Sequence, residues 1–432
     1  MNTIIWNNLN DAEKSAAVSR RGGAADDAAL RKTVADIIEN VKQNGDKALF
    51  EYAKKFDGVA ITNLQVTPDE FAAAETLDSE TKNAIETAYA NIKRFHELQK
   101  PPREELNRDG IHLWHEYRPI ERVGLYVPGG TAPLVSTLLM LAIPAAIARC
   151  DEIIVTTPCN KQGGVPAPIL YAAKLCGISK IFKIGGAGAV AALAYGTASV
   201  PKVDKIFGPG NKYVTQAKQQ VAADRNGAAL DMPAGPSEVL VIADETANPA
   251  FVASDLLAQA EHDQDAGVVL VCTSGDFANK VRGEIKSQVK NLSRLEIIDA
   301  ALKNGKFIIA GNVEQALEIS NMYAPEHLML QVGDTKRYLG QIKNAGSVFI
   351  GDFSSEALGD YASGTNHVLP TDGYAKTYSG ISVLSFMKAI SFQEVSRDGL
   401  LRLAPAVEKL AELEGLEAHK KSIIIRKTCH ST

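Results

Sequence analysis

The sequence predicts an α/β fold with two similar units, each built around a parallel β-sheet. Short apolar stretches alternate with glycine- and proline-rich turns and alanine-rich helical segments, a pattern typical of βα repeats. The alternation starts at Val123 and starts again at Glu238, which indicates two sheets rather than one. At 432 residues the chain is also longer than a single ordinary core accommodates.

Seven apolar stretches have the length and the flanking turns expected of buried strands. Four strands are expected in the first unit, over residues 123–127, 152–156, 180–184 and 205–207, and three in the second, over residues 238–243, 268–272 and 306–310. Helices are expected over residues 167–176, 189–195 and 251–260. Because strand, turn and helix follow one another repeatedly, neighbouring strands are expected to be parallel.

The two ends of the chain differ from this pattern. Residues 27–44 and 79–99 carry apolar residues at helical spacing, and Pro101-Pro102 ends this helix-rich region and opens a charged connector. Near the C-terminus, residues 404–417 predict a charged amphipathic helix and residues 422–426 a lone strand. These last two elements have little core of their own, so we expect them to pack on something else, such as a partner subunit.

The composition is that of a soluble enzyme and argues against several other classes of protein. The net charge is −5 and no Lys/Arg cluster forms a basic face, which argues against a nucleic-acid partner. The longest apolar run, residues 138–148, is too short to span a bilayer, and the N-terminus lacks the apolar core of a signal peptide. The five cysteines show no CxxC spacing and are interpreted as reduced thiols. We therefore expect a cytoplasmic protein with no nucleic-acid or membrane partner.

Gln259 and His262 are three residues apart at the end of a predicted helix. Residues at this spacing share a helix face, so the amide oxygen and the imidazole can point at one atom. Such a pair suits a borderline divalent metal such as zinc. The same residues also fit a plain helix C-terminus at which His262 caps carbonyl groups.

Residues 186–191 match the pattern GxGxxA between an expected strand and an expected helix, with Asp204 eighteen residues beyond Gly186. Helix N-termini of this kind bind phosphates, which would indicate a dinucleotide. A run so rich in alanine and glycine also matches by chance, and Asp204 also fits the next strand.

Glu326 and His327 follow Pro325 and place a carboxylate beside an imidazole. Histidine titrates near neutral pH and suits a general base, while a glutamate can activate water. Adjacent side chains need not face each other, so the pair is interpreted as two separate proton-transfer groups. The alternative is an ordinary loop with two exposed polar residues.

Two more segments carry candidate residues. The glycine-punctuated segment 358–367 is of the kind that contacts small ligands, with Asp360 as a hard oxygen ligand and His367 as a hydrogen-bonding group. A surface turn is the alternative. Glu414 and His419 flank the end of the last predicted helix, where the helix dipole also favours a histidine.

Taken together, seven segments make the chain resemble the histidinol dehydrogenase family, in the family's order and over about three hundred residues. The matching segments are residues 124–130, 207–211, 231–238, 259–262, 325–328, 359–370 and 418–420.

The resemblance implies the oxidation of L-histidinol to L-histidine, the end of histidine biosynthesis. Two successive hydride transfers to NAD would pass through an aldehyde-level intermediate. The resemblance also implies one zinc ion per subunit, bound by Gln259, His262, Asp360 and His419. Two nitrogen and two oxygen donors leave room for the substrate to enter the metal shell. The metal would hold the imidazole and the amine of histidinol, with polarisation as a secondary role.

The same resemblance assigns the proton transfers and the remaining substrate contacts. His327 would take the alcohol proton in the first oxidation and act as base in the second, and Glu326 would activate the water that adds to the aldehyde. The zinc ligands and His327 would contact the substrate. The further substrate-binding positions would be Ser237, His367 and Glu414, the last as a partner of the cationic amine.

Tyr126 and Asn211 match positions that contact NAD in the family. Gly188 departs from the family pattern, because glutamine is common there, and we expect one side-chain contact to the cofactor to be missing. The family is not known for a standard dinucleotide fingerprint, so the GxGxxA match is interpreted as coincidental.

The fold that the resemblance implies is an interlocked homodimer of two incomplete Rossmann-like units with small terminal segments. The expected parts are an N-terminal segment (1–25), a first α/β domain (26–122 with 239–385), an NAD-side domain (123–238) and a C-terminal dimerisation segment (386–432). Glu414 and His419 would then reach the active site of the other subunit.

Three other functions remain open from the residues alone. A zinc hydrolase would use Glu326 to activate water, and a zinc sensor would need no base at all. A dehydrogenase of another amino alcohol would share the metal and proton-transfer residues.

Overall fold

The computed structural model describes residues 1–20, 28–129 and 133–428. The chain divides into two compact units, residues 1–99 with 120–386 and residues 100–119 with 387–432. Each unit is described by itself.

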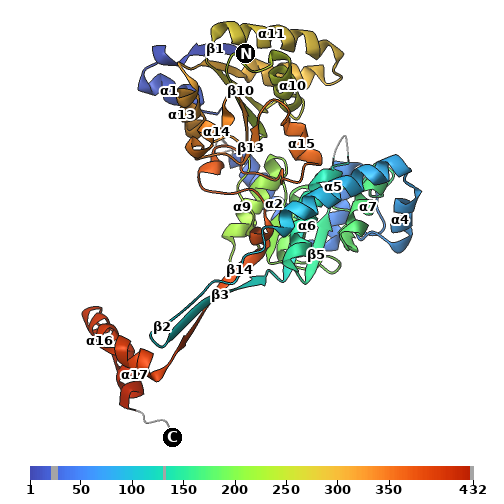
Figure 1. The fold of residues 1–432 in the computed structure, drawn as a ribbon. Coiled ribbons are helices and arrows are strands. Elements are labelled where there is room, and N and C mark those ends of the chain that lie inside the picture. The colour runs from blue at the N-terminus through green and yellow to red at the C-terminus, as the bar shows by residue number, and fades with distance from the viewer. Residues whose placement is uncertain (21–27, 130–132, 429–432) are drawn as a thin grey trace. The chain divides into compact units, whose positions relative to one another are not determined.

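A six-stranded parallel sheet forms one part of the larger unit, in the order β1-β11-β10-β9-β12-β13 (Figure 1). Its strands are β1 (Asn2–Ile5), β9 (Glu238–Ala243), β10 (Gly267–Cys272), β11 (Lys306–Ile309), β12 (His327–Gln331) and β13 (Ser347–Ile350). The N-terminal strand β1 runs parallel to β11, with Asn2 opposite Lys306. The beginning of the chain therefore completes a sheet whose other strands come after residue 237.

Helices cover both faces of this sheet, since successive residues of each strand point to opposite faces. Val239 and Val241 of β9 pack with α10 (Pro249–Ala260), α11 (Gly275–Gln288) and α12 (Leu295–Asn304). Leu240 and Ile242 pack on the other face with α1 (Asp11–Val18) and α13 (Val313–Tyr323). The strands are accordingly buried on both sides. The short helices α14 (Thr335–Tyr338) and α15 (Glu356–Tyr361) follow β12 and β13.

A five-stranded parallel sheet forms the other part of the larger unit, in the order β6-β5-β4-β7-β8. Its strands are β4 (Arg122–Tyr126), β5 (Glu152–Thr156), β6 (Lys180–Phe182), β7 (Lys205–Phe207) and β8 (Ala229–Leu230). Strands β5 and β6 extend the sheet to one side of β4, and β7 and β8 extend it to the other side. The direction of winding therefore reverses between β4 and β7, and such a switch point is where open α/β sheets bind ligands.

The helices that accompany this sheet come from two parts of the chain. They are α2 (Ala28–Asn44), α3 (Asp46–Tyr52), α4 (Pro68–Ala72), α5 (Ser79–Glu97), α6 (Val135–Ala148), α7 (Ala167–Leu175), α8 (Gly186–Tyr195) and α9 (Lys212–Ala223). Helix α2 packs on α8 and α9, and α5 packs on α6 and α7. The domain boundaries expected from the sequence remain a prediction. What the structure shows is that α2 and α5, which come before β4 in the chain, pack on the helices of this sheet.

The smaller unit is an antiparallel three-stranded sheet followed by two helices. The sheet has the order β14-β3-β2, with β2 (Glu105–Arg108), β3 (Ile111–Pro119) and β14 (Met387–Val395). Helix α16 (Arg397–Leu413) packs on α17 (Glu417–Thr428). Large apolar side chains on these helices are solvent-exposed, among them Leu410 at 58 % and Leu413 at 71 %.

The α/β class and the two parallel sheets are confirmed, and one local prediction is wrong. Residues 422–426, expected to form a lone strand, belong to α17. The run of isoleucines favours a strand locally, but Lys427 pairs with Glu408 of α16 at 2.7 Å and the helix pair prevails. The charged connector after Pro101-Pro102 contains β2 and β3, which pair with each other.

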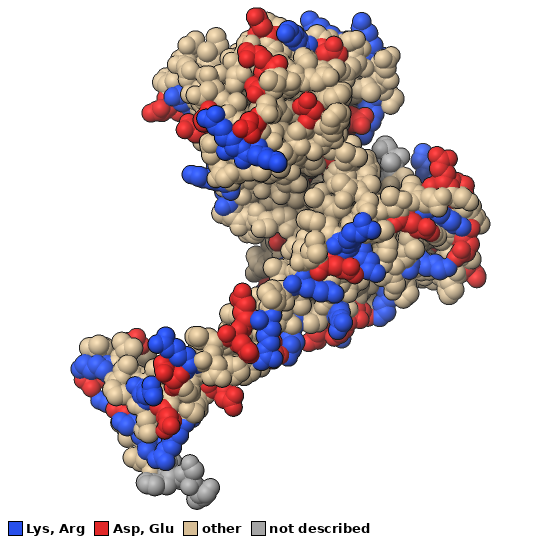
Figure 2. Space-filling model, in the orientation of Figure 1, with Lys and Arg blue, Asp and Glu red and all other residues tan. Residues whose placement is uncertain are grey.

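Two further observations concern the charge of the surface and the search for membrane-spanning helices. Basic and acidic side chains are interspersed over the face shown in Figure 2. Within the described ranges, no helix is both long enough and apolar enough to cross a membrane.

Candidate active site at the amino edge of the six-stranded sheet

The two predicted proton-transfer residues lie at the start of β12, at the amino edge of the sheet. Glu326 and His327 are 5 % and 4 % exposed, so the reading of this segment as an exposed loop is wrong. Strand β9 begins beside them, with Val239 opposite His327. The backbone N–H of Glu238 donates to Glu326 Oε2 at 2.8 Å, and its carbonyl oxygen lies 3.2 Å from His327 Nδ1.

Oxygen atoms surround one nitrogen of the His327 ring. Besides the Glu238 carbonyl, Glu356 Oε1 lies 3.5 Å and Glu326 Oε2 3.6 Å from Nδ1. Since these atoms are acceptors, Nδ1 carries the proton and Nε2 is the nitrogen left to accept one. Nε2 is buried, has no hydrogen-bond partner within the described residues, and lies 3.5 Å from Asp360 Oδ1. Glu326 and His327 therefore form one connected group rather than two separate ones.

Burial and charge shift the pKa values of this group strongly. Burial raises the pKa of Glu326 to about 8 and that of Glu356 to about 8. For His327, burial lowers the pKa, but the carboxylates of Glu356, Glu326 and Asp360 outweigh it and raise the pKa to about 10. Several carboxyl groups around one imidazole favour a positive charge in their midst. A metal cation among the same carboxylates would oppose the imidazolium form of His327.

A group of three donors beside His327 has the spacing of a metal site. One donor atom each from His262, Glu356 and Asp360 lies within 4.8 Å of the other two. His262 follows the C-terminus of α10, whereas Glu356 and Asp360 are four residues apart on α15 and share a face of that helix. Nitrogen and carboxylate donors at this spacing suit zinc and similar divalent ions.

Gln259 supplies an independent sign of a missing ligand. It is fully buried in the last turn of α10, and neither atom of its amide has a hydrogen-bond partner in the described parts of the chain. Leaving such a group unsatisfied costs about 1–3 kcal/mol. A cation held by the neighbouring donors would satisfy the amide oxygen, so the residues present fit a divalent metal. His262 is close by, since its N–H donates to the Gln259 carbonyl at 3.2 Å.

Buried polar contacts hold α15 in position. Ser355, which precedes the helix, donates its hydroxyl to Asp255 Oδ1 of α10 at 3.0 Å, and Gln331 of β12 donates to Asp255 Oδ2 at 3.0 Å. His367 Nδ1 lies 2.8 Å from the backbone oxygen of Asp360, and its Nε2 lies 3.3 Å from the hydroxyl of Thr137. The donors on α10 and α15 thus face one another in a fixed arrangement.

The structure brings most of the candidate residues together. His262, Glu326, His327, Asp360 and His367 belong to one connected cluster, and Ser237 lies half-buried immediately before β9. Glu414 and His419 lie exposed in the smaller unit.

Sequence reasoning missed Glu356. Its four-residue spacing from Asp360 on one short helix is the signal that would have found it.

The three candidate cofactor residues lie in the five-stranded sheet or in the helices that accompany it. Tyr126 ends β4, and Asn211 follows β7 and caps α9 by accepting from the N–H of Val214 at 3.2 Å. Both lie at the carboxyl ends of the two strands that flank the switch point. Gly208 has φ +119°, and a Cβ there would lie 2.1 Å from the Tyr126 carbonyl oxygen. Only glycine lets the β7 turn approach β4 so closely.

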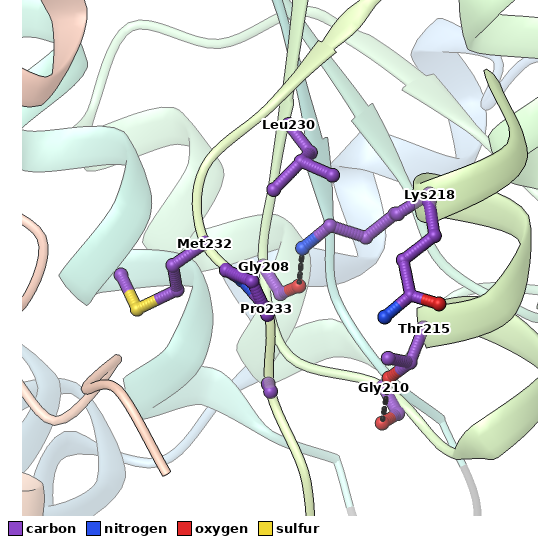
Figure 3. Close-up of a pocket in the computed structure, with 9 residues that line it drawn as sticks. Gly208, Gly210, Thr215, Lys218, Leu230, Met232 and Pro233 are labelled. Atoms are coloured by element: carbon purple, nitrogen blue, oxygen red, sulfur yellow. Dashed lines mark hydrogen bonds between the residues drawn. The ribbon is translucent and has the colours of Figure 1, made fainter. Parts of the chain in front are cut away.

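Lys218 fixes the turn after β7. Its ammonium group donates to the Gly208 carbonyl at 2.8 Å (Figure 3) and also pairs with Asp231. A hollow of about 240 Å³, which includes its opening to solvent, lies beside this turn. Its lining residues are Gly208, Gly210, Thr215, Lys218, Gln219, Leu230, Met232, Pro233 and Ala234.

The structure also bears on the GxGxxA match. Asp204 precedes β7 at the amino edge of its sheet, where its carboxylate accepts from the Arg122 N–H at 3.0 Å. The ribose-binding carboxylate of a fingerprint would lie at the carboxyl edge, so the dinucleotide fingerprint is not present. Gly188 lies buried in α8, and a Cβ there would meet the Tyr52 ring at 3.1 Å.

Comparisons with known proteins agree over nearly the whole chain. A family model described as histidinol dehydrogenase matches residues 20–427. A histidinol dehydrogenase of Campylobacter jejuni (strain RM1221) is 51 % identical over 428 residues, which cover 99 % of this chain and 99 % of that protein. One from Vibrio parahaemolyticus is 50 % identical, covering 99 % and 98 %.

A solved structure matches the fold as well. The crystal structure of histidinol dehydrogenase from Elizabethkingia anophelis superposes with a TM-score of 0.95 at 46 % identity, covering 99 % of this chain and 98 % of that one.

Proposed function

The chain belongs to the histidinol dehydrogenase family and oxidises histidinol in histidine biosynthesis, and we propose the residues and cofactors with which it does so. The family membership brings a dinucleotide cofactor, which we propose is NAD. We further propose one zinc ion per subunit, held by Gln259, His262 and Asp360 together with His419 of the partner subunit. The observation that carries the metal proposal is the buried amide of Gln259, which has no hydrogen-bond partner among the described residues and stands three residues before His262 of the three-donor cluster.

The proposed zinc ion and NAD would supply Lewis-acid and hydride-accepting chemistry that the side chains lack. Bound zinc would hold the imidazole and amine of histidinol and secondarily polarise its alcohol oxygen. Bound NAD would accept the hydrogen of the carbinol carbon as hydride, once in each oxidation.

His327 is the base of the first oxidation. Its Nε2 takes the hydroxyl proton while the carbinol C–H bond breaks and its hydrogen leaves with the electron pair. The carbon reaches the aldehyde level and His327 becomes an imidazolium. The Glu238 carbonyl, 3.2 Å from Nδ1, keeps the ring oriented through this change because it accepts the Nδ1 proton in both states.

Glu326 prepares the second oxidation. Its carboxylate takes a proton from water as the water oxygen bonds to the aldehyde carbon, and the imidazolium of His327 returns its proton to the aldehyde oxygen, which gives the hydrate. His327, neutral again, takes a hydroxyl proton of the hydrate as the second hydride leaves. The product is the carboxylic acid, L-histidine. Each histidinol therefore consumes one water and reduces two nicotinamides.

We propose that the cofactor binds at the switch point between β4 and β7, near Tyr126 and Asn211. The turn at Gly208 lies directly against the Tyr126 carbonyl, and a switch point of this kind is where open α/β sheets bind ligands. Gly188 offers no side chain to the cofactor. Because a Cβ at this position would already meet the Tyr52 ring, the ring fits against the glycine, which supports the expectation of a missing side-chain contact to the cofactor.

We propose an interlocked homodimer in which the partner completes each site. Apolar side chains are exposed on and before α15, with Phe353 at 87 %, Leu358 at 52 % and Tyr361 at 61 %, beside the donors on that helix. The smaller unit exposes its own apolar residues close to Glu414 and His419 along the chain. Covering one surface with the other in a second copy would bury both. Glu414 of the partner subunit would then face the amine of histidinol, with Ser237 and His367 as further substrate contacts.

A cytoplasmic location fits this proposal. The cysteines described, Cys150, Cys159, Cys176 and Cys272, are all free.

The test is a steady-state assay before and after removal of metal by a chelator. Added L-histidinol and NAD should give two reduced nicotinamides per histidinol, and added zinc should restore the lost rate. A zinc hydrolase or a sensor would produce no reduced nicotinamide. A dehydrogenase of another amino alcohol would turn over that alcohol faster than histidinol.

A further inference from the structure

We propose that Arg20 is a positioning residue for the catalytic pair, acting through the side chain of Glu238 and the backbone before Glu326. This inference rests on the roles proposed above for Glu326 and His327. Arg20 touches neither of the two catalytic side chains and lies 218 residues from Glu238 in sequence.

The first step concerns the backbone of Glu238, which both catalytic side chains use as their anchor. Its N–H binds Glu326 Oε2 at 2.8 Å and its carbonyl faces His327 Nδ1 at 3.2 Å. These two contacts decide which oxygen of Glu326 is engaged and which nitrogen of His327 is free. A rotation of this one residue would therefore displace both proton-transfer groups together.

The second step concerns the Glu238 side chain, which is 3 % exposed and held from two sides. Arg20 binds it as a fork, with Nε to Oε2 at 2.8 Å and Nη2 to Oε1 at 3.0 Å. The backbone N–H of Asp372 donates to Oε1 at 2.6 Å. A two-pronged contact of this kind fixes the orientation of the carboxylate as well as its distance.

The third step concerns the chain that leads into Glu326. Arg20 Nη2 also donates to the carbonyl of Ala324 at 3.2 Å, and the guanidinium lies 3.9 Å from the centre of the Tyr323 ring. Ala324 has φ +55°, a left-handed conformation that is unfavourable for a residue other than glycine. The Arg20 guanidinium thus binds two residues at once. One is Ala324, a strained residue two positions before Glu326, and the other is Glu238, whose backbone anchors both catalytic side chains.

A lysine would not reproduce this arrangement. Its ammonium is a single point charge, whereas the planar guanidinium serves the carboxylate, the carbonyl and the ring face at once. Misplacement of reacting groups by about 1 Å costs on the order of 100-fold in rate. The loss of Arg20 is therefore expected in turnover rather than in substrate binding.

The experiment compares Arg20→Gln, Arg20→Lys and Arg20→Ala in the full-length, zinc-loaded enzyme. We expect Arg20→Gln to lower kcat about 10–100-fold, with KM for histidinol and zinc content changed less than about threefold. Arg20→Lys should have a kcat above that of Arg20→Gln but below that of the wild type. Added guanidinium ion should restore turnover to Arg20→Ala, and methylammonium should restore less. Arg337→Gln, which removes an exposed arginine paired with Glu314 at 3.0 Å, is the matched control.

Two checks separate this inference from simple destabilisation. Rates are expressed per folded, zinc-loaded site, and Glu238→Gln is measured beside Arg20→Gln, because it weakens the same fork while leaving the backbone in place. Combining the two changes should cost little more than either alone, since both break one contact. An unchanged kcat per loaded site in both variants would overturn the positioning role.

The outcome also distinguishes the two proposals from each other. If Glu326→Gln and His327→Asn abolish turnover while Arg20→Gln and Glu238→Gln keep the full rate, the positioning role is wrong and the catalytic assignment stands. If Glu326→Gln and His327→Asn keep the full rate, the catalytic assignment fails and the positioning role fails with it.

Discussion

The environment of His327 Nδ1 determines which ring nitrogen can act as a base. Three oxygen atoms lie within 3.6 Å of Nδ1, whereas among the described residues only the Asp360 carboxylate, at 3.5 Å, is recorded beside Nε2. The adjacency of Glu326 and His327 in sequence did not indicate this, because it says nothing about side-chain direction. The deciding contacts come from Glu238 and Glu356, on other elements of the fold.

The tautomer leads to a prediction for His327→Asn. The asparagine amide can still donate to the Glu238 carbonyl in the place of Nδ1, but it has no atom in the place of Nε2. We expect kcat to fall at least about 100-fold, the usual worth of a general base, with zinc content unchanged. Turnover and zinc measured on one preparation check this. A variant that loses zinc in proportion to activity would point to a structural role instead.

Glu356 is the residue whose role the sequence did not suggest. Its Oε2 is buried without a partner in the described chain, and the carboxyl group belongs to the three-donor cluster. Glu356→Gln keeps the shape and removes the charge, so we expect zinc affinity to fall about 10–100-fold. Competition with a chromogenic chelator measures the affinity, and the exposed Glu314→Gln serves as the control. Equal zinc affinity in both variants would exclude Glu356 from the metal site.

At the scale of elements, predictability follows the range of the interactions. β5, β7 and β9 were predicted with their observed bounds, because a buried parallel strand is an apolar run between turns. β1 was not predicted, since its partner β11 lies about three hundred residues away. The isoleucine run of α17 was predicted as a strand because the contact of this segment with α16, which overrides its local preference, cannot be seen in the run itself. Helix spacing suggested His262 and the glycine-punctuated segment suggested Asp360 as metal ligands, and only the fold shows that their donor atoms lie close together.

Helix α5 carries a prediction of pH dependence. His96 is fully buried, its Nδ1 lies 2.9 Å from the Ile92 carbonyl, and its Nε2 lies 3.2 Å from the amide nitrogen of Asn366, which precedes His367. Burial lowers the pKa of His96 below its ordinary value. The stability that neutral His96 contributes is therefore complete above the unfolded-state pKa, about 6.5, and is lost as the pH falls below it.

The measurement compares melting temperatures of the wild type and His96→Gln from pH 7.5 down to pH 5. We expect the wild type to lose more stability over this interval than the variant, because the variant has no imidazole to protonate. Parallel curves would contradict the prediction, because they would mean that His96 binds protons equally in the folded and the unfolded state.

At the scale of the whole molecule, the proposed shared site makes activity a property of two chains. His327 and His419 would serve one site from different subunits. Enzyme with His327→Asn and enzyme with His419→Ala should each be inactive, yet a mixed dimer has one site with neither change. Random mixing makes about half of the dimers mixed, so about a quarter of the wild-type activity should return.

Co-expression with two different affinity tags isolates the mixed dimer for this assay. A mixed dimer as inactive as its parents would show that His327 and His419 act within one chain. As a control, His327→Asn mixed with Glu326→Gln should regain nothing, because each of its two sites carries one of these changes.

The pairing of β1 with β11 has a consequence for how the protein is made. A ribosome adds about 5–20 residues per second, so Asn2–Ile5 emerges about 15–60 seconds before its partner strand exists. During that interval the five-stranded sheet, all of it before residue 231, is already out of the exit tunnel and free to fold. Residues Asn2–Ile5 are thus translated early but find their place late, and nascent chains stalled before Lys306 would carry these residues unpaired next to a folded five-stranded sheet.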